Sequence, residues 1–233
     1  MHVTPDEIVY WQSGPIVISA TLVFTWAVML LMVVGSWLIT RRLTSDAQMS
    51  PGQNLLEIIV MGMQTQIREV SRQDPAPYLP FIGTLFLFIL ICNLLAIIPG
   101  YQAPTGSLTT TAALAACVFV AVPIHGISKQ GLRGYLRQYL EPTVIMLPFN
   151  IFGELSRTLS LAVRLFGNVM SGGMIAGILL IIAPLFVPVL MQALGLLTGV
   201  VQAYIFAILA MVYIGSATQA HQHSREASDK GDG

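Results

Sequence analysis

The chain has 233 residues, of which 55% are hydrophobic and only 9% are charged. A soluble domain carries about 25% charged residues, so this composition excludes an ordinary soluble domain and indicates a helical membrane protein with several spans. The formal net charge is zero, which gives no reason to expect a nucleic-acid partner. We expect no cofactor, and no metal site with Cys or His ligands at diagnostic spacing.

Five membrane helices and one amphipathic helix are expected along the chain. The apolar runs that predict the membrane helices cover residues 14–39, 80–98, 108–127, 148–183 and 189–217. Between 51 and 72, apolar residues that include Leu55, Ile58 and Ile67 recur at helical spacing. This helix either lies at the membrane interface or is an ordinary connecting helix.

The last two apolar runs are far longer than a bilayer core of about 30 Å requires at 1.5 Å per residue. The helix over residues 148–183 is therefore strongly tilted, broken or partly outside the bilayer, and after a turn at residues 184–188 a second long helix runs back. The chain then divides into an N-terminal span with the amphipathic helix (1–79), a two-span hairpin (80–142), the long tilted hairpin (143–220) and a polar tail (221–233). The tail histidines, His221 and His223, either bind a metal or simply lie in a solvated, frayed tail.

Lys and Arg are distributed unevenly between the polar segments. They occur in residues 40–78, in residues 128–142 and in the tail, and they are missing from the N-terminal segment, the 99–107 loop and the 184–188 turn. Because positively charged loops stay on the cytoplasmic side, we expect the N-terminus outside and the C-terminus in the cytoplasm.

A polar stripe marks the fourth membrane helix around Arg164. Its members are spaced 3, 4, 4 and 3 residues apart, which places them on one helical face: Arg157, Ser160, Arg164, Asn168 and Ser171. An arginine at membrane depth costs about 2.5–3.5 kcal/mol or more. No Asp or Glu occurs in the other four apolar runs, so Arg164 has no obvious counter-ion in its own chain. We infer an acidic partner on another subunit.

The fifth membrane helix carries a second pattern of small and polar residues, spaced 3, 4 and 3 apart: Gln192, Gly195, Gly199 and Gln202. Glycines four residues apart let membrane helices approach closely. Gln202 would then lie at mid-depth, where it either faces Arg164 or belongs to a helix contact with its amide hydrogen-bonded to backbone.

The segment LSLAVRLFGNVMSG, residues 159–172, resembles the hallmark segment of the a subunit of F-type ATP synthases. Four further segments agree in order and spacing: PFIGTLFLFILICNLLAIIPG from Pro80, APTGSLTTTAALA from Ala103, LPFNIFGELSRTLS from Leu147 and LGLLTGVVQAYIFAILAMVYIG from Leu194. The resemblance covers residues 80–215, and the part before it agrees in layout only.

The resemblance implies a stator subunit of a rotary ATP synthase in a bacterial inner membrane. The last two long helices would form a steeply tilted hairpin that faces a ring of c subunits, each with one carboxylate, and two aqueous half-channels would meet that ring. Arg164 would stand between the half-channels, with Asn168 and Gln202 flanking it. Residues that would support the path by polarity or close packing are Glu154, Arg157, Ser160, Ser171, Gly172, Gly173, Gly195 and Gly199.

Further partners implied by the resemblance are the peripheral-stalk b subunits, the other ATP synthase subunits and the lipid bilayer. The chain has no GxxxxGK[ST] motif for a nucleotide, so we expect no catalytic site of its own and place the ATP chemistry on partner subunits.

The coupling ion stays open between a proton and sodium. Many family members have an acid at the position of Gly173, some a histidine at that of Gly195, and many an Asp at that of Ser107; none of the three is titratable here. A stand-alone secondary transporter is the competing hypothesis, but such proteins often show internal repeats, and we find none. A purely structural subunit would leave Arg164 unexplained.

Overall fold

The computed structural model describes residues 9–13, 16–41, 51–98, 101–140, 146–182 and 187–229. Its elements in chain order are β1 (Val9–Ser13), β2 (Ile16–Ser19), α1 (Ala20–Thr40), α2 (Pro51–Ser71), α3 (Leu79–Leu95), the 3-10 turn η2 (Pro104–Gly106), α4 (Leu108–Leu140), α5 (Met146–Ile182) and α6 (Val187–Asp229). Most of the predicted 184–188 turn, and the side chains of His221 and His223, lie outside this description.

Helices dominate the part of the chain that the structure describes. Four of them are long and apolar enough to cross a membrane: α1, the first part of α4, most of α5 and most of α6. The apolar helix α3 is shorter, at 17 residues, or about 26 Å against a hydrocarbon core of about 30 Å. The prediction of a polytopic, helical membrane protein is confirmed.

A two-stranded antiparallel hairpin, β1–β2, precedes the first helix. The first span was predicted to begin at residue 14, but α1 begins only at Ala20. The segments Val9–Ser13 and Ile16–Ser19 are rich in β-branched and aromatic residues, which favour strands over helices. Hydrophobicity alone does not distinguish these short strands from the start of an apolar helix.

The amphipathic helix predicted between 51 and 72 is confirmed as α2, which packs on α3 and α6. Its buried face includes Ile67, and the Tyr204 hydroxyl of α6 donates a hydrogen bond to Gln66 Oε1 at 2.6 Å. Leu55 and Ile58 lie on the opposite, exposed face. The apolar residues of α2 therefore divide between two surfaces, one for the bundle and one for the surroundings.

The segment after the third span is helical, where the sequence indicated only a short polar connection. The helix continues to Leu140 but breaks at Gly131, whose φ of 74° and ψ of 162° are not helical. Glycine adopts this positive φ without the steric cost that other residues would meet. α4 is thus two helical pieces joined at Gly131, and only the first, Leu108–Lys129, is apolar enough to span a membrane.

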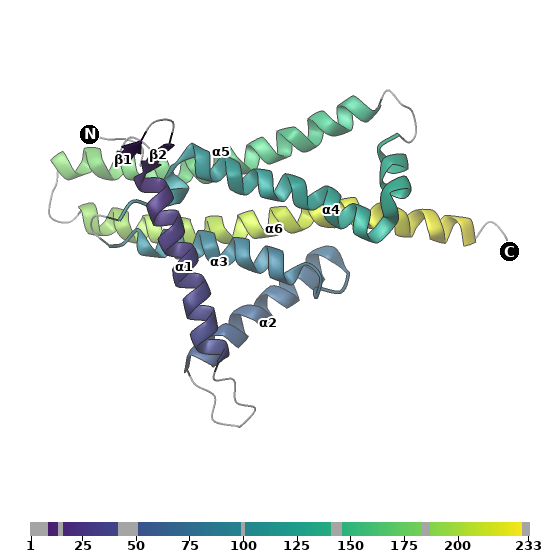
Figure 1. Ribbon diagram of the computed structural model, residues 1–233, viewed down its shortest axis with the longest axis horizontal. Coiled ribbons are helices and arrows are strands. Elements are labelled where there is room, and N and C mark those ends of the chain that lie inside the picture. The colour runs from purple at the N-terminus through teal and green to yellow at the C-terminus, as the bar shows by residue number, and fades with distance from the viewer. Residues whose placement is uncertain are drawn as a thin grey trace.

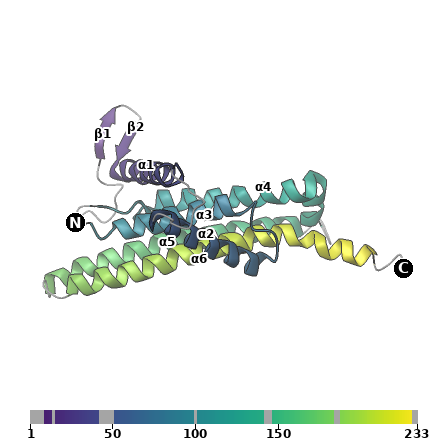
Figure 2. The ribbon, with the colours of Figure 1, turned by 90° about the horizontal axis from the view of Figure 1, so that it is seen from below.

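The two long helices α5 and α6 have 37 and 43 residues, and α6 continues through the predicted frayed tail to Asp229. Their apolar parts have 32 and 28 residues, or about 48 Å and 42 Å, so fitting them into a core of about 30 Å requires tilts of roughly 50° and 45°. Figures 1 and 2 show their connected ends projecting beyond the other helices. α1 runs across this bundle rather than along it (Figure 1).

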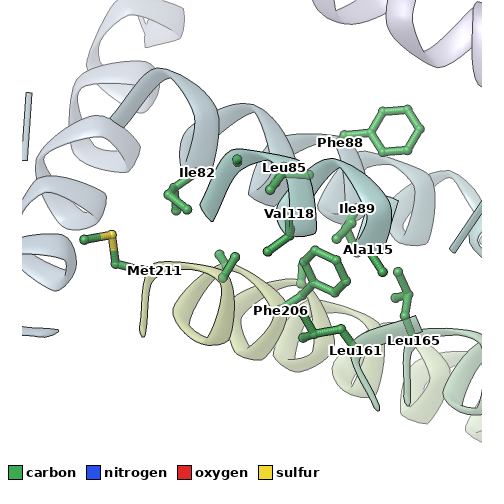
Figure 3. Packing of buried hydrophobic residues seen from close by; sticks show 14 of the residues in the cluster. Ile82, Leu85, Phe88, Ile89, Ala115, Val118, Leu161, Leu165, Phe206 and Met211 are labelled. Atoms are coloured by element: carbon green, nitrogen blue, oxygen red, sulfur yellow. The ribbon is translucent and has the colours of Figure 1, made fainter. Parts of the chain in front are cut away.

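The core lies where α3, α4, α5 and α6 meet (Figure 3). Ile89 of α3, Leu165 of α5 and Phe206 of α6 are fully buried there. By contrast, the buried residues of α1 are Ala20, Thr21 and Val28, so this helix is mostly exposed in the single chain. The core therefore fixes α5 and α6 against α3 and α4, and with them the polar residues along both long helices.

Candidate functional site

The polar stripe of α5 lies on one uninterrupted helix, as its spacing predicted. Arg157, Ser160, Arg164 and Ser171 are exposed in the single chain, and Asn168 is partly buried. The neighbouring residues Leu161 and Leu165 are buried and form the packing face of α5. The stripe thus runs along the border between the packed face of the helix and its open surface.

Arg164 is exposed and makes no hydrogen bond or ion pair with any residue that the structure describes. Glu154, the carboxylate on the same helix, is ten residues away, or about 15 Å along the axis. Val163, beside Arg164 in the chain, is 57% exposed. Arg164 therefore lies on the open surface of α5 without a charged partner among the described residues.

Two cavities lie along α5 and α6, one on each side of Arg164. One, the Glu154 cavity, has a volume of about 470 Å³ and is lined from α4, α5 and α6 by residues that include Glu154, Arg157 and Ser216. The other, the Gln192 cavity, has a volume of about 440 Å³ and is lined by the end of α3, Ala103, α5 and α6.

Arg164 and Gln202 both fall between these two cavities. Along α5, the lining of the Glu154 cavity ends at Thr158 and that of the Gln192 cavity begins at Asn168. Along α6, the Gln192 cavity ends at Gly199, and the Glu154 cavity begins only at Tyr213. The two polar residues predicted at mid-depth therefore lie between the two cavity linings along their helices, Arg164 on the exposed surface of α5 and Gln202 buried in α6.

The cavities differ in chemistry. Arg157 lies at the Glu154 cavity with its guanidinium 5.8 Å from the ring centre of Tyr213. The Gln192 cavity has no titratable side chain among its described lining residues. There, amide side chains link helices: Asn168 Nδ2 donates to Thr198 O at 3.4 Å, and Gln192 Nε2 donates to Ile97 O at 2.9 Å.

Gly172 and Gly173 of α5 and Gly195 of α6 also line the Gln192 cavity. A Cβ added at any of the three would meet nothing within 4 Å. These glycines therefore widen the cavity instead of bringing helices together. The close approach predicted for Gly195 is wrong, because this residue faces open space.

Gly199 does make a close approach, but its neighbour is α3. A Cβ at Gly199 would lie 2.8 Å from the Cβ of Asn93. Gln202, one turn later, is 5% exposed, and its Nε2 atom has no hydrogen-bond partner among the described residues. No described hydrogen bond joins it to Arg164. Asn93 was not among the predicted site residues, although a lone asparagine in an apolar span indicates a polar contact between helices.

The comparisons with known proteins agree with this architecture. A family model described as ATP synthase A chain matches residues 22–215. The chain belongs to this family. It is 65% identical over 224 residues to "ATP synthase subunit a 2" of Acaryochloris marina, with 96% of each chain covered. It is 60% identical over 230 residues to "ATP synthase subunit a" of Albidiferax ferrireducens, with 99% of this chain and 100% of the relative covered.

A third relative, "ATP synthase subunit a 1" of Chlorobaculum parvum, is 62% identical over 224 residues, with 96% of this chain and 99% of the relative covered. As a member of this family, the chain is the membrane stator subunit of an F-type ATP synthase, and it is a multi-pass protein of the membrane sector of the bacterial complex. Nothing among the relatives favours a stand-alone transporter.

Proposed function

We propose that Arg164 receives the ionised carboxylates of a c-subunit ring at the barrier between two ion half-channels, the Glu154 cavity and the Gln192 cavity. The observation that carries this proposal is the position of Arg164 on the open surface of α5, between the two cavity linings. An ion would enter through one cavity, ride on the ring and leave through the other. The subunit thereby couples ion movement to ATP synthesis or hydrolysis.

The distribution of Lys and Arg supports an orientation for this path. With the C-terminus in the cytoplasm, the Glu154 cavity opens to the cytoplasmic side, because its α6 lining residues, Tyr213 and Ser216, come late in that helix. The Gln192 cavity, lined from Met191 onward, then opens to the outside together with the N-terminus. Each half-channel would reach the membrane interior from one side only.

Arginine suits the barrier for an electrostatic reason. An ionised carboxylate in hydrocarbon is prohibitively costly, but beside a guanidinium it is stabilised. A guanidinium also stays protonated at every working pH, whereas a buried lysine ammonium can lose its proton. The attraction must nearly balance the loss of hydration, since a pair that is too stable would stop rotation of the ring.

The surface around Arg164 supports contact with an apolar partner. Leu159 and Val163 of α5, and Leu197 and Val201 of α6, are between 47% and 62% exposed. Such a surface fits the outer helices of a ring in the membrane. We place the peripheral-stalk b subunits, the other ATP synthase subunits and lipid on the remaining surfaces, and the nucleotide chemistry on partner subunits, so that this chain has no catalytic site of its own.

The coupling ion is a proton or sodium. Asn168, Gln202 and the supporting residues Ser160 and Ser171 supply hydroxyl and amide groups along the path, and none of these groups titrates. In the Gln192 cavity an ion therefore moves by way of water and neutral polar groups, whichever ion it is. ATP-driven uptake in proteoliposomes, measured with and without sodium and with an uncoupler, distinguishes the two. Sodium uptake that survives the uncoupler identifies sodium as the primary ion.

Arg164→Ala tests the central role. We expect the complex to assemble and ATP-driven ion transport in proteoliposomes to be abolished, because the ring carboxylate loses its partner at the barrier. Arg68→Ala, at an exposed arginine of α2, is the matched control and should transport normally. Retained coupling in Arg164→Ala would overturn the proposal.

A further inference from the structure

A buried hydrogen-bonded node joins three elements beside the Gln192 cavity. Asn93 Nδ2 of α3 donates to the carbonyl oxygen of Gly199 in α6 at 2.9 Å. Asn93 Oδ1 accepts a hydrogen bond from Thr105 Oγ1 of η2 at 3.1 Å. Asn93 is 6% exposed and Thr105 is fully buried. Both ends of one amide are thus engaged, in a place where an unpaired polar group would be costly.

The node requires glycine at position 199. A Cβ there would lie 2.8 Å from Asn93 Cβ, 3.1 Å from its Cγ and 3.2 Å from its Nδ2. Because Asn93 Cβ is attached directly to the backbone of α3, it cannot swing aside as the end of a flexible side chain could. Any larger residue at 199 must move the two helices apart.

The extra hydrogen bond does not break α6. A carbonyl oxygen has two lone pairs, so Gly199 O can accept from Asn93 as well as from the amide four residues later in the helix. The preceding carbonyl, Thr198 O, accepts from Asn168 of α5. Two successive peptide groups of α6 are thus bonded from two different helices. Such a pair of contacts defines both the rotation of α6 about its axis and its height along that axis.

The node lies next to the proposed barrier. Asn93 and Gly199 form the end of the Gln192 cavity lining on their helices that is nearest to Gln202. Gln202 follows Gly199 by three residues, or about 4.5 Å along the axis. A change in the rotation or height of α6 at Gly199 is therefore passed directly to Gln202 and to the surface that meets the ring.

We propose that Asn93, Thr105 and Gly199 form a positioning site that holds α6 in register with the Arg164 stripe of α5. This inference rests on the proposed function of Arg164. None of the three needs to touch the ion or the ring carboxylate. They act by fixing where Gln202 stands and where the Gln192 cavity ends.

The test exchanges the Cβ between the two helices. In Gly199→Ala the helices must move apart by about half an ångström or more, and we expect ATP-driven ion transport per assembled complex to fall by about tenfold or more. In the double variant Asn93→Gly with Gly199→Ala, the clash disappears although the hydrogen bond is also lost. We expect its transport to recover to the level of Asn93→Gly alone.

Two control variants separate positioning from general packing. Gly215→Ala lies in the same helix, where a new Cβ makes ordinary contact with Ser71 Cβ at 3.9 Å. Cys92→Ala removes a buried side chain next to Asn93 in the chain. Both should transport at the normal rate per assembled complex. The amount of this subunit retained in purified complexes is measured for every variant, so that lost assembly is not counted as lost transport.

Recovery in the double variant would show that the loss in Gly199→Ala comes from displacement of α6 by the clash, because the double variant keeps the alanine at 199 and lacks only the Cβ at 93 that it would meet. Normal transport in Gly199→Ala, or a double variant no better than Gly199→Ala, would overturn the inference. Arg164→Ala is measured in parallel. If only Arg164→Ala loses transport, the positioning site is wrong and the proposed function stands; if Arg164→Ala retains transport, the proposed function itself fails.

Discussion

Gln202→Leu separates a role in ion movement from a role in packing. Gln202 is 5% exposed, and its Nε2 atom has no hydrogen-bond partner among the described residues. Leaving a buried donor unsatisfied costs about 1–3 kcal/mol, and leucine fills a similar volume without that donor. We therefore expect the variant to be as stable as the parent, or more stable by up to about 1–3 kcal/mol. A buried donor that lowers stability by this amount indicates that Gln202 has a function other than packing.

The expected functional effect has the opposite sign. If the amide serves the path between the two cavities, removing it weakens transport without abolishing it, because Arg164 remains. A tenfold loss corresponds to about 1.4 kcal/mol in the barrier to ion transfer. The initial rate of ATP-driven ion uptake in proteoliposomes, divided by the amount of assembled complex, measures this loss. Thermal unfolding of the purified complex measures the change in stability.

Thr111→Val is the matched control. Thr111 is fully buried, and its Oγ1 hydrogen-bonds to Ser107 O at 3.2 Å and to Leu108 O at 3.0 Å. Losing a satisfied hydrogen bond should cost about 1 kcal/mol of stability and leave transport unchanged. An unchanged transport rate in Gln202→Leu would assign Gln202 to packing. A loss of stability larger than that of Thr111→Val would refute the reasoning from an unsatisfied donor.

Two further predictions concern the cavities. Gly195→Leu should assemble normally, because a Cβ there meets nothing within 4 Å, but it should slow transport by filling the Gln192 cavity. Gly62→Leu on α2, where a new Cβ is equally free of contacts, should transport at the normal rate. Equal rates in both variants would show that the Gln192 cavity is not on the ion path. Arg157→Gln removes the guanidinium 5.8 Å from the Tyr213 ring, and a double-mutant cycle of thermal stability with Tyr213→Leu should give a coupling of about 0.5–1 kcal/mol. Additive effects of the two substitutions would contradict this contact.

The two glycines of α6 show where pattern reasoning stops. Gly195 and Gly199 share a spacing that is typical of helix contacts, and the spacing alone makes them equivalent. In the folded chain Gly199 lies against Asn93 of α3, and Gly195 faces open space. A helical wheel gives the direction of a residue from its own axis. It does not give the rotation, height or identity of the neighbouring helix.

The ends of the elements show a related limit. The first helix begins at Ala20 because a short hairpin takes up the apolar residues before it, and α4 and α6 continue as helices through segments that their polar composition marked as connections or tail. Hydrophobicity reports burial in lipid or protein. It does not report where backbone hydrogen bonding starts or ends, which depends on local propensity and on neighbouring elements.

The sequence by itself determined the membrane class, the long helices and the polar stripe around Arg164, because these depend on hydrophobicity and on a 3.6-residue period within one segment. The family also follows from the sequence, through the segments around residues 159–172 and through the relatives that share them. Only the tertiary structure decided that Arg164 stands between two cavities, that Gly199 of α6 lies in close contact with α3, and that Asn93 of α3 hydrogen-bonds to the Gly199 carbonyl. Those features arise from residues that lie far apart in the sequence, as Asn93 and Gly199 do at 106 positions, and the packing of whole helices brings them together.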